Sequence, residues 1–76
     1  MQPSAKYFAG QLNKHLDEMD VPVPIRERAV ILSKMLDIPK QLAWSLLEGQ
    51  QLPDHDLLEK IAAEFEVDVK SLIEKV

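Results

Sequence analysis

Apolar residues recur every three or four positions through most of the chain, which is the spacing of one face of an α-helix. No segment shows the sustained alternation of apolar and polar positions that is typical of a strand. The five prolines, at positions 3, 22, 24, 39 and 53, fall between the periodic stretches and mark the breaks. The pattern therefore predicts an all-α fold of five helices in a single domain, residues 1–76.

The first expected helix starts after Pro3, with Ser4 as its N-cap, and ends near Asp20. The second starts close to Pro24, because the intervening Val-Pro-Val-Pro segment cannot continue a helix. The expected inner face of the first helix comprises Phe8, Leu12, Leu16 and Met19. That of the second comprises Ala29, Leu32 and Leu36, widened by Ile25, Val30, Ile31 and Met35.

The second half of the chain predicts three shorter helices. Pro39 opens a third helix over residues 40–48, and Gly49 closes it, as a glycine commonly does just past a helix end. Asp54 is the expected N-cap of a fourth helix, residues 55–65, and Asp68 that of a fifth, residues 69–75. The expected inner residues are Leu42 or Ala43 with Leu46 and Leu47, then Leu57, Leu58, Ile61, Ala62 and Phe65, and finally Leu72 and Ile73. Six of these stripe residues are expected to share one core: Leu12, Leu32, Leu36, Leu46, Ile61 and Phe65.

The composition excludes several classes of site and of protein. The chain has no cysteine, which excludes a disulfide framework, a thiolate metal site and a cysteine nucleophile. No apolar run has the roughly 18 residues of a membrane span, and the N-terminus does not resemble a signal peptide, so a cytoplasmic location is expected. A Gly-rich phosphate loop, a Ser/His/Asp set and a pair of catalytic carboxylates are all lacking, so we expect neither an enzyme nor a cofactor. Asp54-His55-Asp56 is explained by helix capping and does not predict a metal site.

Residues 26–49 carry the clearest functional signal: a helix, a three-residue break and a short second helix closed by glycine. This is the arrangement of a DNA-binding helix-turn-helix, in which the second helix lies in the major groove. An αα-corner inside any helical bundle has the same spacing. On spacing alone, the two interpretations stay open.

The order of apolar residues over residues 32–72 resembles the Cro/lambda-repressor-like (XRE) family of helix-turn-helix domains. The resemblance is carried by Leu32-x-x-x-Leu36-x-Ile38, Ala43-x-x-Leu46-Leu47-Glu48-Gly49, Pro53, and Leu57-Leu58-x-x-Ile61-Ala62-x-x-Phe65-x-Val67-x-x-x-x-Leu72. Phe8-Ala9-x-x-Leu12-Asn13, followed by a proline-containing loop and an Arg-rich helix start, is similar to a bacterial and prophage branch. Membership would imply a repressor-like transcriptional regulator that binds double-stranded DNA as a homodimer. The chain departs from the family where Asp37 replaces the usual turn glycine and where the third helix has a single basic residue.

The expected DNA contacts lie in and around this segment: Arg26, Arg28, Lys40, Gln41, Trp44, Ser45, Gln50 and Gln51. Lys40, Gln41 and Ser45 are side-chain types that can reach base edges in the major groove. Arg26 and Arg28 stand where a phosphate contact would fall. An ordinary solvated helix face remains the alternative, and Trp44 is either a surface contact or part of the core.

The charge distribution leaves a second function open. The net charge is −4, which disfavours phosphate binding, but residues 26–51 sum to +1 whereas residues 52–76 sum to −4. The alternative is a protein-interaction module that has kept the helix-turn-helix scaffold, lost DNA binding, and docks through Trp44 and the Leu46-Leu47 side. For a dimer, the expected contact surface is the fourth and fifth helices.

Overall fold

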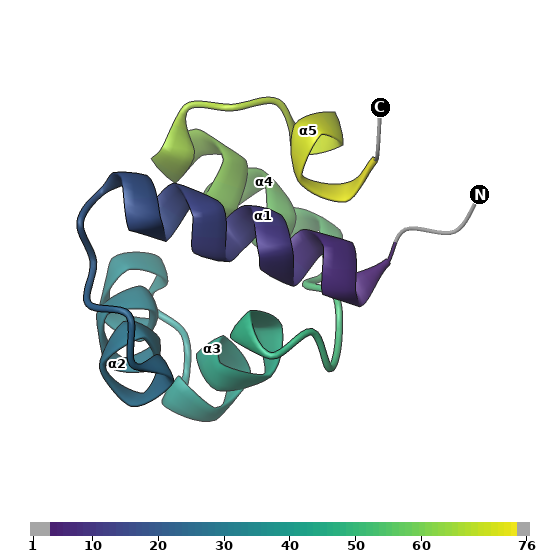
Figure 1. The fold of residues 1–76 in the computed structure, drawn as a ribbon. Coiled ribbons are helices and arrows are strands. Elements are labelled where there is room, and N and C mark those ends of the chain that lie inside the picture. Colours follow the sequence, from purple (N-terminus) through teal and green to yellow (C-terminus); the bar gives the residue numbers. More distant parts are fainter. Residues whose placement is uncertain (1–3, 75–76) are drawn as a thin grey trace.

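The computed structural model describes residues 4–74, which form five α-helices and confirm the all-α prediction (Figure 1). The helices are α1 (Ala5–Glu18), α2 (Ile25–Leu36), α3 (Lys40–Leu47), α4 (His55–Phe65) and α5 (Val69–Ile73). Each lies within two residues of its predicted bounds; Lys75, the expected end of the fifth, lies outside the described residues. Within residues 4–74, no helix has both the length and the apolar character that crossing a membrane requires.

Two helices begin with the predicted side-chain cap. The Ser4 hydroxyl accepts a hydrogen bond from the Tyr7 N–H at 3.2 Å, and the Asp54 carboxylate accepts one from the Leu57 N–H at 2.8 Å. Each cap satisfies one backbone donor that the first helical turn leaves without a partner. The prediction for Asp68 is wrong in its mechanism: it occupies the N-cap position, but its side chain makes no capping bond.

Four helices end at a residue with left-handed backbone geometry, after which the chain bonds back to the helix. These residues are Asp20, Asp37, Gly49 and Glu66, with φ between 57° and 74°. In each case the following residue donates its N–H to the carbonyl five positions earlier, at 3.0 Å: Val21 to Leu16, Ile38 to Ser33, Gln50 to Ser45, and Val67 to Ala62. This is the Schellman type of helix end, and Gly49 confirms its predicted role in it.

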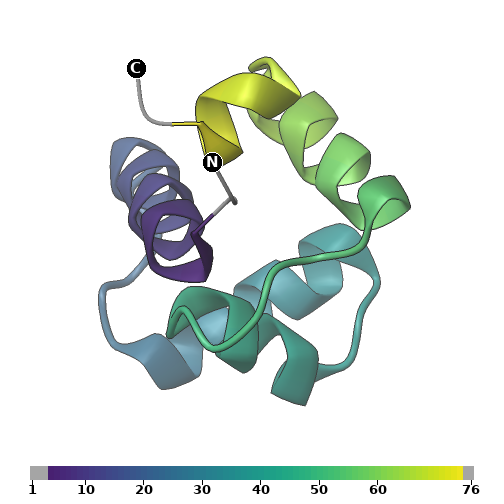
Figure 2. The same ribbon diagram turned by 90° about the vertical axis from the view of Figure 1, so that its right-hand side faces the viewer.

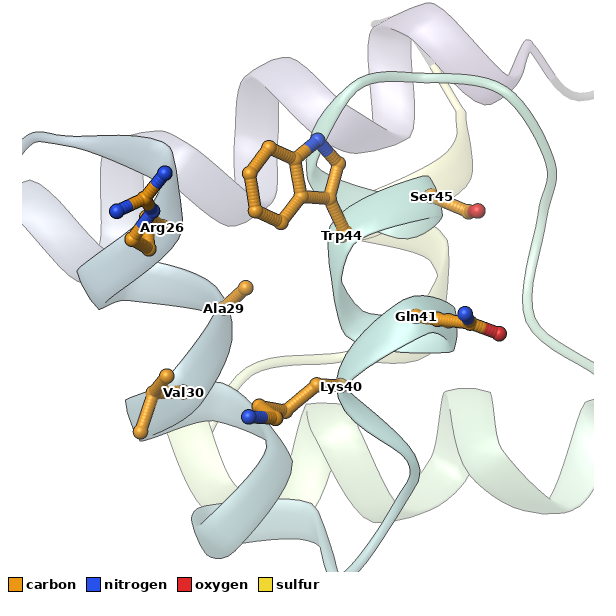
Figure 3. Close-up of a pocket in the computed structure, with 7 residues that line it drawn as sticks. All are labelled: Arg26, Ala29, Val30, Lys40, Gln41, Trp44 and Ser45. Carbon is orange, nitrogen blue, oxygen red and sulfur yellow. The ribbon is translucent and has the colours of Figure 1, made fainter.

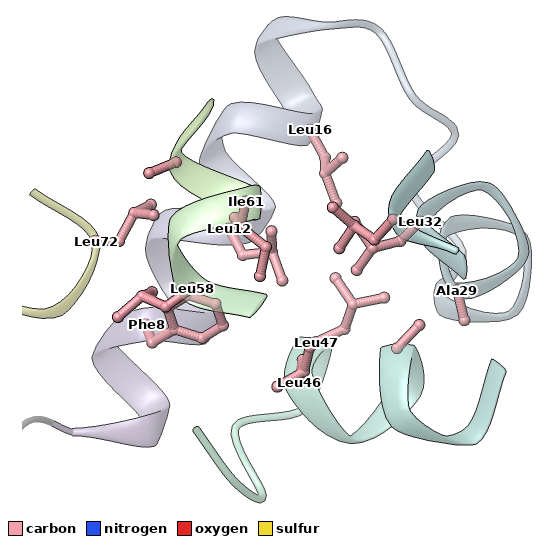
Figure 4. Close-up of a cluster of buried hydrophobic side chains, with 13 residues drawn as sticks. Phe8, Leu12, Leu16, Ala29, Leu32, Leu46, Leu47, Leu58, Ile61 and Leu72 are labelled. Atoms are coloured by element: carbon pink, nitrogen blue, oxygen red, sulfur yellow. The ribbon is translucent and has the colours of Figure 1, made fainter. Parts of the chain in front are cut away.

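The core draws side chains from all five helices (Figure 4). It comprises Phe8, Leu12, Leu16, Ala29, Leu32, Leu36, Ala43, Leu46, Leu47, Leu58, Ile61, Ala62 and Leu72. Five of the six side chains expected to share it are buried; the sixth, Phe65, is only partly buried. Its ring stacks on the imidazole of His15, with the ring centres 5.3 Å apart, and so links α4 to α1. Full burial of one leucine or phenylalanine side chain stabilises the fold by roughly 1.5–3 kcal/mol.

Met19 is a wrong core prediction. Its side chain is exposed, because α1 ends at Glu18 and Met19 already belongs to the turn. Beneath α1, helices α2 and α3 pack against each other, while α4 and α5 close the opposite side (Figures 1 and 2). The outer surface formed by α2 and α3 is thereby left uncovered by the other helices.

Candidate nucleic-acid interface

Helices α2 and α3 are joined by the predicted three-residue turn, Asp37-Ile38-Pro39. Asp37 adopts φ 57° and ψ 51°, so it takes the left-handed conformation in which a glycine would be expected. Aspartate is one of the few other residues that reach this conformation at modest cost. Pro39 then sets the start of α3. Asp37 therefore ends α2 in the backbone conformation that a glycine would adopt at this position.

A groove of about 680 Å³ runs between the outer surfaces of α2 and α3 (Figure 3). We call it the α2–α3 groove; it is lined by Arg26, Ala29, Val30, Lys40, Gln41, Trp44 and Ser45. Five of the eight predicted contact residues thus come together along this one surface. The lining set has two cations and no carboxylate, although the chain as a whole is acidic.

The N-terminal half of α3 projects its polar side chains outward because its other side is anchored in the core. Ala43, Leu46 and Leu47 are buried, as predicted. Lys40, Gln41 and Trp44 are exposed, with 36% of the Trp44 surface accessible, so the surface interpretation of Trp44 holds and the core interpretation is wrong.

The exposed residues of α3 divide into two sides. The side chains of Lys40 and Trp44 extend toward α2, whereas those of Gln41 and Ser45 point away from it (Figure 3). Each pair is separated by four positions, the spacing that stacks side chains one above the other on a helix. The two sides therefore differ in chemistry: a cation and an aromatic ring on one, an amide and a hydroxyl on the other.

The first turns of α2 and α3 also keep their backbone donors available. Pro24 and Pro39 occupy the N-cap positions, and neither helix has a side-chain cap, in contrast to α1 and α4. Uncapped N–H groups at a helix start carry a partial positive charge and suit phosphate oxygens. Arg26 and Lys40 lie in these same first turns and add full positive charges, whereas Glu27 adds a negative charge to the first turn of α2.

Arg28 does not fit the role of a phosphate contact. Its side chain is only 3% exposed, and its guanidinium bonds to main-chain and side-chain oxygens of α1 and the loop after it. Nε donates to the Pro22 carbonyl at 3.0 Å, Nη1 to both oxygens of Asn13 at 3.2 and 3.0 Å, and Nη2 to the Asp17 carboxylate at 2.7 Å and the Val21 carbonyl at 3.0 Å. All five guanidinium donors are therefore used inside the fold. The prediction of a DNA contact at Arg28 is wrong.

Arg28 instead ties α2 to α1 inside the fold. Asn13, which accepts from it, donates its own amide to the carbonyls of Ala9 at 2.9 Å and Leu47 at 3.2 Å. The chain of bonds runs from α2 through α1 to the last residue of α3. The sequence did contain an indication that Arg28 is buried. Arg28 precedes Leu32 and Leu36 at spacings of four and so lies on the buried stripe of its helix. On α4, Lys60 adds a further anchor by donating to the Leu36 carbonyl, at 2.6 Å, where α2 ends.

The remaining predicted DNA contacts do not line the α2–α3 groove. Gln50 and Gln51 are exposed in the loop after α3, and the Gln50 amide donates to the Glu48 carboxylate at 3.2 Å. His55 pairs with Glu59 on α4, 3.5 Å away. In the part of the chain that the structure describes, no three His, Asp or Glu side chains are grouped as a metal site would need.

Comparisons with protein-family models, curated proteins and solved structures found no match to this chain. The resemblance to the Cro/lambda-repressor-like family therefore stays a prediction from the sequence. What supports a function is the geometry of α2, α3 and the groove between them.

Proposed function

We propose that this chain binds double-stranded DNA sequence-specifically, with α3 in the major groove, and acts as a repressor-like transcriptional regulator. The observation that carries the proposal is the outward side of α3, where Lys40, Gln41, Trp44 and Ser45 project from a helix anchored by three buried residues. A rigid helix with such side chains at its leading end matches the way this motif reads base edges. The uncapped first turns of α2 and α3 supply further donors for phosphate.

Two copies on one operator are part of the proposal, but α4 and α5 are a poor surface for pairing in free solution. Around their exposed side lie Asp54, Asp56, Glu59, Glu64, Glu66, Asp68 and Glu74, against Lys60 and Lys70. Among the described residues, the exposed large hydrophobic side chains are Met19, Val23 and Trp44, all outside α4 and α5. We propose that the copies meet on DNA, at half-sites about 10 base pairs apart or a multiple of that.

The test is selection of bound sequences from random duplexes, followed by fluorescence anisotropy on the selected site and a scrambled duplex. Gln41→Ala should weaken binding to the selected site by about 1–3 kcal/mol and leave the scrambled duplex nearly unchanged. Gln11→Ala is the matched control, because this glutamine lies on α1, away from the proposed DNA-contacting helix, and should not alter the preference for the selected sequence. A wild-type chain that binds no duplex even at low salt would overturn the proposal.

The second candidate function, docking on another protein, rests on the exposed Trp44 and the half-buried Val30 in the same groove; the Leu46-Leu47 side, which was expected to take part, is buried in the core and is not available for docking. An exposed aromatic beside small apolar residues is typical of an interface anchor. The two functions are separated by the partner that occupies the groove, duplex DNA or a polypeptide.

A further inference from the structure

The two sides of α3 face different surroundings, and this difference suggests that they contact different parts of DNA within the proposed interface. Lys40 and Trp44 extend toward α2, into the α2–α3 groove that also holds Arg26 (Figure 3). Arg26 and Lys40 lie toward opposite ends of the groove, with Ala29 between them (Figure 3). The groove thus has a cation toward each end, with Ala29, Val30 and the Trp44 ring between them; Gln41 and Ser45 also line it, but their polar ends point away from α2.

A single DNA strand has the matching pattern along its backbone. Anionic phosphates alternate with deoxyribose rings, whose carbon-rich faces suit an aromatic or aliphatic surface. Charged side chains satisfy phosphates without reading sequence, whereas amides and hydroxyls directed at base edges do read it. Gln41 and Ser45, on the side of α3 that points away from α2, are the residues left for base contacts.

We propose that the α2–α3 groove holds the sugar–phosphate backbone of one DNA strand, with Arg26 and Lys40 on phosphates and Trp44 against a deoxyribose. Sequence reading then falls to Gln41 and Ser45. This inference rests on the proposed DNA binding and assigns Lys40, whose ammonium could serve either a base edge or a phosphate, to the backbone. It also gives the exposed tryptophan a role that does not depend on sequence.

Trp44 reports directly on occupancy of the groove, because it is the only tryptophan in the chain. Saturating duplex should shield its fluorescence from acrylamide, and the scrambled duplex at low salt should shield it as well as the selected site does. A polyglutamate peptide supplies the comparison with an acidic polypeptide. Shielding by polyglutamate but not by duplex would overturn the inference in favour of a protein partner.

Charge-neutralising variants test the phosphate contacts. Arg26→Gln and Lys40→Gln should each weaken the selected and scrambled duplexes by the same factor. When salt rises from roughly 50 to 200 mM, the affinity of each variant should fall about 3.5-fold less than that of wild type. The reason is that one lost phosphate contact lowers the salt slope by about 0.9. Lys34→Gln removes the same charge from an exposed position of α2 outside the groove and should do neither.

The outcomes separate this inference from the proposed function. If anisotropy shows sequence-specific binding but Trp44 stays open to acrylamide, DNA binding stands and the groove assignment is wrong. The assignment is equally wrong if Lys40→Gln lowers the preference for the selected site as Gln41→Ala does. If no duplex binds at any salt concentration, both fail together.

Discussion

Replacing Arg28 by alanine should destabilise the fold severely without altering the proposed DNA-contacting surface. The substitution removes all five guanidinium hydrogen bonds, and with them the partner of the Asn13 side chain and of three main-chain carbonyls. Removing one member of a buried charged pair costs about 3–5 kcal/mol. The Asp17 side chain is 60% exposed, so water can solvate its carboxylate once Arg28 is removed. The expected loss in the free energy of unfolding is therefore near the lower limit, about 3 kcal/mol.

A loss of this size is a large part of the stability of a domain of 76 residues. At roughly 4–8 °C per kcal/mol, the midpoint of thermal unfolding should fall by about 12–24 °C. Arg28→Lys keeps the positive charge but has only three donors on a single nitrogen, so it should recover a minor part of the loss. The matched control is Arg26→Ala, on the exposed surface of the same helix, which should stay within about 0.5 kcal/mol of wild type.

Urea and thermal unfolding followed by far-UV circular dichroism measure these differences. DNA binding gives a second, independent readout. Under conditions where Arg28→Ala is folded, its salt slope on duplex DNA should equal that of wild type, because the guanidinium contacts no phosphate. Unfolding midpoints that coincide for Arg28→Ala and Arg26→Ala would refute the structural role, and a reduced salt slope would return Arg28 to the proposed DNA interface.

Three further substitutions test the fold at defined points by the same unfolding measurements. Gly49→Ala should destabilise the fold by about 1–2 kcal/mol, because φ is 74° and a Cβ would lie 3.1 Å from the Lys6 Cα. Gly10→Ala, on the exposed side of α1 with no atom within 4 Å of the added Cβ, should stabilise it by about 0.5–1 kcal/mol. Equal shifts for the two variants would contradict this. Glu66→Gly should stabilise by up to about 1 kcal/mol by relieving a left-handed glutamate, and any loss would show that the strain is smaller than the added chain entropy. Ile61→Ala should cost roughly 2–5 kcal/mol at a fully buried site, and unchanged unfolding would place the inner face of α4 elsewhere.

The helix bounds were predictable because local chemistry sets them. Ser4 and Asp54 cap helices through bonds to residues only three positions away, and proline at 24 and 39 fixes where a helix starts. The inner faces followed from spacing in the same way. The outward-facing residues of α3 were predictable for a related reason. Once Ala43 and Leu46 face inward, Trp44 and Ser45 between them must face outward, and Lys40 and Gln41 lie one turn before them on the same two sides.

Arg28 was not predictable from local chemistry. Its acceptors lie between residues 13 and 22, up to 15 positions away, and they converge only when α1 and α2 pack. Its position near the start of the second helix favoured a phosphate contact, with a solvated helix face as the alternative, and both place the side chain at the surface, where most charged residues lie. The apolar spacing was the better guide, and the full set of acceptors explains how the burial is tolerated.

The burial of Arg28 also changes how much affinity electrostatics can supply, which gives a last prediction. Arg28 and Asp17 neutralise each other within the fold, and of the other cations in α2 and α3 only Arg26 and Lys40 line the groove. Two phosphate contacts per bound copy correspond to a salt slope of about −1.8, far shallower than for proteins that make six to ten. The acidic residues around α4 and α5 should further weaken non-specific association by repelling the duplex. Affinity for the selected site would then depend mainly on base contacts. Because both duplexes offer the same phosphate contacts, the ratio of selected to scrambled binding should stay nearly constant as salt rises. Anisotropy titrations at several salt concentrations measure both quantities, and a slope of about −4 or steeper per copy would place further phosphate contacts outside the groove.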